Sequence, residues 1–147
     1  MTKIITKNER ETKKVAGLLA KEIVRKPLKV KNAVVIGLQG ELGSGKTNFV
    51  QGFAKELKIR KRLTSPTFVV LKRYAISNKQ YANLYHIDCY RLNKASDLLD
   101  LDFSEIINNP KNIVLIEWAE KVQKILPKNT IRIKFRVIDE KKRKITI

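Results

Sequence analysis

The strongest constraint on the fold of this chain is a glycine-rich octapeptide that directly follows a continuous apolar run. The octapeptide reads Gly40-Glu41-Leu42-Gly43-Ser44-Gly45-Lys46-Thr47, which is the spacing of a P-loop, or Walker A, motif. The apolar run, Ala33 to Leu38, is typical of a strand that is buried on both faces. Apolar residues recur at helical spacing after the octapeptide, from Phe49 to Leu57. The sequence therefore predicts a strand, a loop and a helix in immediate succession.

The residue types in this loop match the chemistry of phosphate binding. Gly43 and Gly45 allow the sharp backbone turn that brings N–H groups against phosphate oxygens. The start of the following helix adds free N–H groups and a partial positive charge. Lys46 can neutralise the β- and γ-phosphates, and the Thr47 hydroxyl can coordinate Mg²⁺. We expect ATP and Mg²⁺ to bind over Gly43, Ser44, Gly45, Lys46, Thr47 and Asn48.

The remaining pattern fits one domain spanning residues 1–147, of the three-layer P-loop NTPase-like α/β class with a mixed central sheet. Thr6-Lys7-Asn8-Glu9 resembles a capping box before an amphipathic helix that ends at Pro27. The apolar positions expected along that helix are Val15, Leu18, Leu19, Ile23 and Val24. Short helices are expected from Ser96 to Ile107. The expected strands are Phe68–Tyr74 and Tyr81–Ile87, paired as an antiparallel hairpin, then Asn112–Ile116, Ile131–Val137 and Lys144–Ile147.

The composition narrows the functional class. The 147 residues carry 32 Lys and Arg against 14 Asp and Glu, a formal net charge of +18, which attracts polyanions such as nucleotides or RNA. The basic residues form no single block and no aromatic RNA motif accompanies them, so charge alone does not establish nucleic-acid binding. One cysteine, Cys89, permits no internal disulfide, which favours a cytoplasmic location. No apolar stretch is long enough to predict a membrane span.

Two acidic residues follow predicted strands and are candidates for catalysis or metal binding. Glu117 ends the run Asn112 to Ile116, and Asp88 ends the Tyr81–Ile87 strand. A P-loop enzyme needs a carboxylate at such a position to hold Mg²⁺ or to orient water. Each could equally be a surface acid, and the sequence does not separate their roles.

Four other features have ordinary interpretations. Trp118, next to a buried strand, suits core packing, and His86 suits a non-catalytic buried histidine. Cys89 has no neighbouring cysteine and is expected to be inert. Ser65-Pro66-Thr67 is either simple turn punctuation or a loop that senses the γ-phosphate, and the residues alone favour punctuation.

Four segments in order resemble the signatures of the TsaE family (formerly YjeE), the bacterial ATPases required for tRNA threonylcarbamoyladenosine biosynthesis. The resemblance covers about Thr6 to Lys144. The segments are Gly40 to Phe49, Ser65-Pro66-Thr67-Phe68, His86-Ile87-Asp88-Cys89-Tyr90-Arg91-Leu92 and Ile116-Glu117-Trp118-Ala119-Glu120. The P-loop alone occurs in many families, whereas the four signatures in this order are much more specific.

The resemblance implies a slow ATPase that acts on the TsaB–TsaD pair, which transfers a threonylcarbamoyl group to N6 of a tRNA adenosine. By position, Thr47 and Glu117 match the Mg²⁺ residues, Asp88 matches a Walker-B-like acid, and Trp118 matches an active-site aromatic residue. The loop Ser65, Pro66, Thr67 matches a switch-like element, contrary to the first interpretation. The segment Thr6 to Thr12 and Arg143 would lie near the base and ribose.

The chain departs from the family pattern at Asn48, where many members have a second threonine, so one phosphate contact could differ. Its basic charge leaves a direct tRNA contact open, although the family requires only an indirect one. Two other functions compete. A small-molecule kinase would use the same loop but needs an arginine-rich lid, and no such segment stands out between Ile87 and Ile113. A nucleic-acid-binding module with a vestigial P-loop would bind RNA regardless of ATP.

Overall fold

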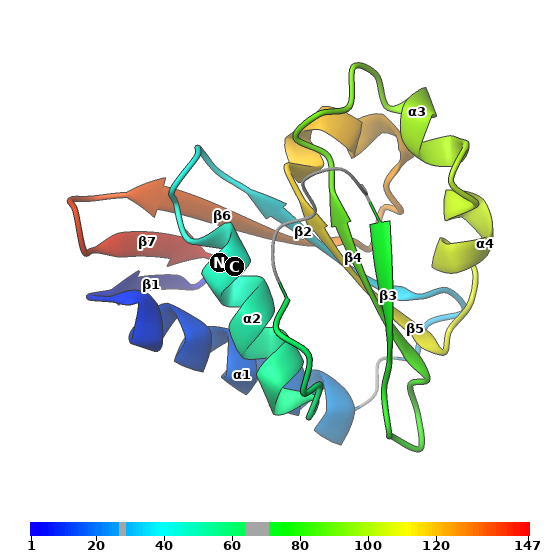
Figure 1. Cartoon of the computed structure of the whole chain (residues 1–147), viewed down its shortest axis with the longest axis horizontal. Coiled ribbons are helices and arrows are strands. Elements are labelled where there is room, and N and C mark those ends of the chain that lie inside the picture. The colour runs from blue at the N-terminus through cyan, green and yellow to red at the C-terminus, as the bar shows by residue number, and fades with distance from the viewer. Residues whose placement is uncertain (27–28, 64–70) are drawn as a thin grey trace.

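The strands form one mixed sheet with helices on both faces, as the sequence predicted (Figure 1). The computed structural model describes residues 1–26, 29–63 and 71–147. The seven-stranded sheet has the order β1-β7-β6-β2-β5-β4-β3. The strands are β1 (Lys3–Thr6), β2 (Val34–Gln39), β3 (Leu71–Ala75), β4 (Asn83–Asp88), β5 (Asn112–Glu117), β6 (Ile131–Val137) and β7 (Arg143–Thr146).

Parallel strands occupy the centre of the sheet, and antiparallel pairs lie at both ends. β2 is parallel to β5 on one side and to β6 on the other, and β4 is parallel to β5. β3 pairs antiparallel with β4, which confirms the predicted hairpin over the described residues; residues 68–70 of the predicted first strand lie outside them. β7 pairs antiparallel with both β6 and β1. The first four-residue strand, β1, was not predicted.

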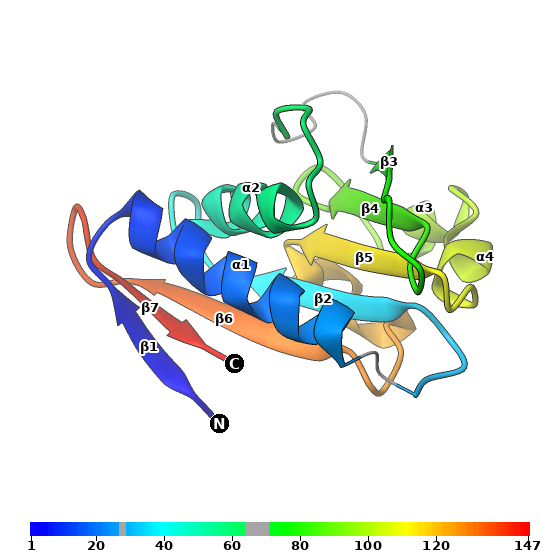
Figure 2. The ribbon, with the colours of Figure 1, turned by 90° about the horizontal axis from the view of Figure 1, so that it is seen from below.

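Two helices cover one face of the sheet and three short helices cover part of the other, which gives the predicted three layers (Figure 2). α1 (Glu9–Arg25) and α2 (Lys46–Glu56) pack over the core that contains Ile36, Leu115 and Ile133. α3 (Ser96–Leu99), α4 (Phe103–Ile107) and the 3-10 helix η1 (Ala119–Ile125) pack over Val35, Val114 and Ile116. Among the described residues, every helix is too short or too polar to span a bilayer.

The start of α1 differs from the prediction by two residues. Asn8, and not Thr6, is the N-cap: its side chain accepts a hydrogen bond from the Glu11 backbone N–H at 2.9 Å. The Glu11 carboxylate accepts in return from the Lys7 N–H at 2.7 Å. Thr6 belongs to β1, and its hydroxyl pairs with that of Thr12 at 2.9 Å.

The apolar face of α1 was also predicted incorrectly at one position. Leu18 is 58% exposed, because the fully buried positions facing α2 and the sheet are the small residues Ala16 and Ala20, together with Ile23. Leu18 is two residues from both Ala16 and Ala20, and at 3.6 residues per turn this spacing places it on the opposite side of the helix, toward solvent. The helix ends at Arg25, before Pro27, which lies outside the described residues.

Candidate functional site

The sheet register brings the glycine-rich loop and both candidate acids to one edge. Parallel pairing aligns Leu38 with Glu117, and Asp88 with Glu117, at the carboxyl ends of β2, β5 and β4. The loop begins two residues after Leu38, at Gly40. Because paired residues on parallel strands point to the same face, Asp88 and Glu117 both face the side covered by α2. Ligands of open α/β sheets bind at this edge.

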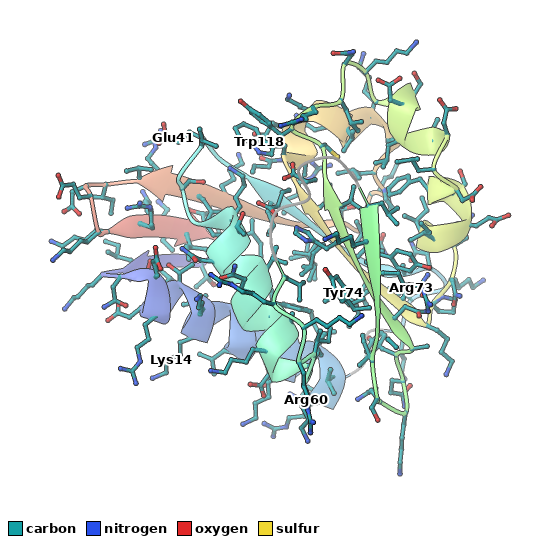
Figure 3. The ribbon with its side chains drawn as sticks, in the orientation of Figure 1. Lys14, Glu41, Arg60, Arg73, Tyr74 and Trp118 are labelled. Carbon is teal, nitrogen blue, oxygen red and sulfur yellow. The ribbon has the colours of Figure 1, made fainter. Side chains whose placement is uncertain are left out.

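A cavity of about 660 Å³ lies at this edge and collects almost all of the predicted site residues. Gly43, Ser44, Gly45, Lys46, Thr47, Asn48, Asp88, Glu117, Trp118 and Arg143 line it, as do Lys7, Asn8, Glu9 and Thr12 from the amino-terminal segment. Ser65, Pro66 and Thr67 lie outside the described residues. Figure 3 shows Glu41 on the loop after β2 and Trp118 at the end of β5, both at this end of the sheet.

The loop backbone is open toward the cavity where a phosphate would approach. Gly43 has a φ of +76° and Gly45 a φ of +101°, conformations that L residues with a side chain rarely adopt. A Cβ on Gly43 would meet nothing within 4 Å. Gly45 is the N-cap of α2 and supplies no side-chain cap. The first N–H groups of α2 therefore face the cavity without a side-chain partner.

Lys46 is held by the loop itself. Its ammonium donates to the carbonyl oxygens of Gly40 at 2.5 Å and Glu41 at 2.9 Å, and to the Ser44 hydroxyl at 3.3 Å. It also lies 4.0 Å from the centroid of the Trp118 ring, a cation–π distance. The residue is 5% exposed, and burial lowers the pKa of the ammonium, while the carboxylates of Glu117, Glu120, Asp88 and Glu41 oppose that shift.

Both carboxylate oxygens of Glu117 have a side-chain partner in the site. One carboxylate oxygen accepts a hydrogen bond from the Thr47 hydroxyl at 2.9 Å. The other lies 2.6 Å from Nε2 of His86, and both residues are buried. An ionised Glu117 accepts this hydrogen bond from a proton on Nε2 of His86. His86 is buried and hydrogen-bonded, as expected for a non-catalytic histidine, but the sequence did not identify Glu117 as its partner, because the two residues are far apart in the chain.

Asp88, Tyr90 and Trp118 also line the cavity, and Asp88 lies beside Glu117 on the neighbouring strand. The Asp88 carboxylate is buried and accepts from the Tyr90 N–H at 2.9 Å. The Tyr90 ring lies 5.0 Å from Trp118, and the Lys121 ammonium donates to the Tyr90 carbonyl. Trp118 has a φ of 58°, so its backbone is strained where β5 turns into η1. Trp118 thus lines the cavity, in contrast to its first interpretation as a core residue.

Arg143 links the carboxyl-terminal hairpin to the loop. Its guanidinium donates to the Gly43 carbonyl at 3.1 Å and to the carbonyls of Asp139 and Lys142. The predicted position near the base and ribose stays a prediction. Cys89 is fully buried, and burial raises the pKa of its thiol to about 12. That environment agrees with an inert cysteine.

The residues present fit a magnesium nucleotide. Thr47, Glu117 and Asp88 offer hydroxyl and carboxylate oxygens, the ligands that Mg²⁺ prefers. Within the described ranges, no three His, Cys, Asp or Glu side chains form a metal cage. Mg²⁺ is commonly held by one or two protein ligands together with substrate phosphates, so such a donor set is sufficient when a nucleotide is present.

The mixed sheet and the junction of β2, the glycine-rich loop and α2 together define a P-loop NTPase-like α/β protein. A model of the family described as "Threonylcarbamoyl adenosine biosynthesis protein TsaE" matches residues 6–145. The chain belongs to the TsaE family.

Relatives support this placement over nearly the whole length. The tRNA threonylcarbamoyladenosine biosynthesis protein TsaE of Rickettsia felis is 39% identical over 98% of this chain and 78% of its own. The Bacillus subtilis protein of the same name is 37% identical over 96% of this chain and 81% of its own length. The Aquifex aeolicus protein of that name is 34% identical over 100% of this chain and 96% of its own length. A crystal structure of Bacillus subtilis YdiB superimposes with a TM-score of 0.72 at 30% identity, covering 98% of this chain and 82% of that one.

Proposed function

We propose that this protein is a magnesium-dependent ATPase of tRNA threonylcarbamoyladenosine biosynthesis, acting in the cytoplasm on the TsaB–TsaD pair. Its relatives carry the name of that pathway. The observation that best supports ATP hydrolysis is the contact between Thr47 and Glu117 at 2.9 Å, in the cavity that also holds Lys46 and Asp88. These are the parts a P-loop ATPase needs: a phosphate cradle, a metal hydroxyl and strand-end acids.

The chain's own residues divide the work as follows. The loop from Gly43 to Asn48 binds and orients the phosphates. Lys46 exchanges its contacts with the loop carbonyls for contacts with phosphate oxygens, and this exchange couples nucleotide binding to loop geometry. Bound Mg²⁺ would neutralise phosphate charge, with Thr47 and one of the two acids, Glu117 or Asp88, as its protein ligands. The other acid orients the attacking water. Trp118 and Tyr90 exclude bulk water from one wall.

The test is ATP turnover by the protein alone and with purified TsaB–TsaD. Asp88→Asn and Glu117→Gln are expected to bind ATP while losing most turnover, about 100-fold or more, because charge and positioning in the transition state are lost. Asp100→Asn, an exposed acid after α3, is the matched control and should be normal.

Normal turnover by both site variants contradicts the catalytic assignment. Equal turnover with and without TsaB–TsaD contradicts partner dependence. Transfer of phosphate to a nucleoside or small alcohol in place of water would identify a kinase.

A further inference from the structure

A second charged surface lies away from the nucleotide cavity, on the part of the second sheet face that α3, α4 and η1 leave uncovered. Among the described residues, the apolar strand side chains packed under α3, α4 and η1 come from β2, β3, β4 and β5, and none comes from β6, β7 or β1. Figure 2 shows these three strands at one side of the sheet, with α1 on the other face. The outer side of β6, β7 and β1 is therefore open.

Strand alternation assigns the residues on this open side. Ile133, Phe135 and Ile145 point into the core under α1 and α2, so their neighbours along β6 and β7 point the opposite way. β1 pairs with β7, and cross-strand partners share a face. The cations on the open side are Lys3, Arg132, Lys134, Arg136 and Lys144, which we call the basic face.

The described strand residues contribute no acid to the basic face. The other side chains that alternate onto it are Ile5, Thr146 and Gln39, none of which is acidic. Arg136 and Lys144 are direct cross-strand partners. Like charges opposite each other destabilise a strand pair, by roughly 0.2–1 kcal/mol relative to a neutral pair. A like-charged cross-strand pair with no acid beside it on the same face is typical of a functional surface.

A shallow hollow gives the basic face a place for an anion. It has a volume of about 360 Å³ and is lined by Lys134, Arg136, Lys144, Thr146 and Gln39, with Gly40 and Phe135 at its border. Three of the five cations thus converge on one hollow. None of the five lines the nucleotide cavity.

From these observations we propose that the basic face docks the phosphate backbone of RNA. Phosphodiesters are recognised by Lys and Arg without apolar anchors, which is the composition of this face. A protein partner would need a buried apolar centre with aromatic residues. Among the described side chains that alternate onto the basic face, Ile5 on the edge strand is the single large apolar one, and it is 60% exposed. Contacts to phosphates alone carry no base readout, so binding is independent of sequence.

The experiment measures binding of a transcribed tRNA over a range of KCl concentrations. Each phosphate contact contributes about 0.7–0.9 to the slope of log K against log salt. Arg132→Gln/Lys134→Gln/Arg136→Gln should reduce that slope by about 2 to 3. The matched control, Lys14→Gln/Lys21→Gln/Lys55→Gln, removes the same charge from the α1 and α2 surface, where Figure 3 shows Lys14 pointing away from the sheet. The slope of this control should differ from the wild-type slope by no more than one phosphate contact contributes, about 0.7–0.9.

Equal loss in both triple variants, or in neither, overturns the proposal, because the charge then acts diffusely or not at all. Loss of poly-glutamate binding with tRNA binding unchanged overturns it in favour of an acidic protein partner. The choice of tRNA as probe depends on the proposed function, whereas the choice of surface does not. MgATP binding, measured on the same three proteins, separates the two: both variants should bind as wild type, and failure of the wild type to bind ATP contradicts the proposed function alone.

Discussion

Glu117 illustrates how one side chain can be fixed by two others that the sequence keeps apart. Thr47 holds one of its oxygens and His86 the other, so the carboxylate has little rotational freedom. Nδ1 of His86 is buried and has no hydrogen-bond partner among the described residues. The buried histidine therefore makes its one hydrogen bond to the acid, and its role is to position Glu117.

Removing the histidine donor should reduce turnover without abolishing nucleotide binding. His86→Leu is expected to lower kcat about 10- to 100-fold, the usual cost of losing a supporting contact to a metal-linked group. The Kd for MgATP should change little. His86→Gln keeps an N–H donor and should recover part of the rate. Equal kcat for the leucine variant and wild type would show that Glu117 needs no such support.

The buried thiol of Cys89 gives a prediction about pH. Burial first, and then the charge of Asp88, raise its pKa to about 12 from an ordinary value of 9.0. The folded state thus favours the protonated thiol, and this contribution to stability is present below pH 9 and is lost as pH rises from 9 toward 12. In the native protein at pH 8, a thiol reagent should label Cys89 only after denaturation. Rapid native labelling would mean that the thiol is accessible.

Among the elements, α1 and α2 pack closely enough that one glycine decides their distance. A Cβ on Gly52 of α2 would lie 2.3 Å from the Lys13 carbonyl oxygen and 2.5 Å from its Cα, both backbone atoms. Backbone atoms cannot turn aside as a side chain would, so the helices must separate. The small buried residues Ala16 and Ala20 of α1 are consistent with the same close approach.

The matched substitutions Gly52→Ala and Gly17→Ala test this packing. Gly52→Ala should lower the free energy of unfolding by at least about 1–3 kcal/mol, the usual cost of overpacking a core. Gly17 lies in α1, where a Cβ would have ordinary contacts beyond 3.6 Å, the nearest at 3.7 Å to Glu56. Gly17→Ala should be neutral or stabilising by about 0.5–1 kcal/mol through helix propensity. Urea unfolding measures both, and an equal effect of the two would contradict the account.

Most elements could be predicted because each has a hydrophobic pattern in its own sequence. β2 and β5 are continuous apolar runs because both of their faces are buried, and β6 alternates because one of its faces is buried. β1 has only four residues, and pairing with β7 near the end of the chain stabilises it, so its cause is not local. Likewise, capping by Asn8 competes with the similar pattern at Thr6, and tertiary packing of Thr6 against Thr12 decides between them.

The site could be predicted only in part for a related reason. A motif fixes Lys46 and Thr47, and strand ends suggest Asp88 and Glu117, since parallel strands deliver their carboxyl ends to one edge. Contacts across the sheet depend on strand order, which the period of an element does not encode. The pairing of His86 with Glu117 and the contact of Arg143 with Gly43 belong to this second kind.

Considered as a whole molecule, the protein combines a compact sheet with a large excess of positive charge. The net charge of +18 acts against the folded state, because folding brings like charges together. Salt at 0.15 M screens exposed charges over about 8 Å. Both the stability of the protein and its affinity for polyanions are therefore expected to depend on ionic strength, in opposite directions.

Raising KCl from 20 to 500 mM should accordingly raise the free energy of unfolding measured in urea. Neutralisation of the basic face should shrink that increase, because the variant has less repulsion to screen. Urea is the suitable denaturant, since guanidinium chloride would itself screen the charges. A free energy of unfolding that falls with added KCl would mean that attractive ion pairs outweigh the repulsion.

The most direct test of the central claim is calorimetric titration of the protein with MgATP. The wild type should bind one nucleotide per chain. Lys46→Ala should bind at least about tenfold more weakly, since a hydrogen bond to a charged group contributes roughly 1.5–3 kcal/mol. Lys55→Ala, an exposed lysine of the same helix, should bind as the wild type does. No heat with the wild type, or equal affinity for the wild type and Lys46→Ala, would contradict the assignment of the loop as the nucleotide site.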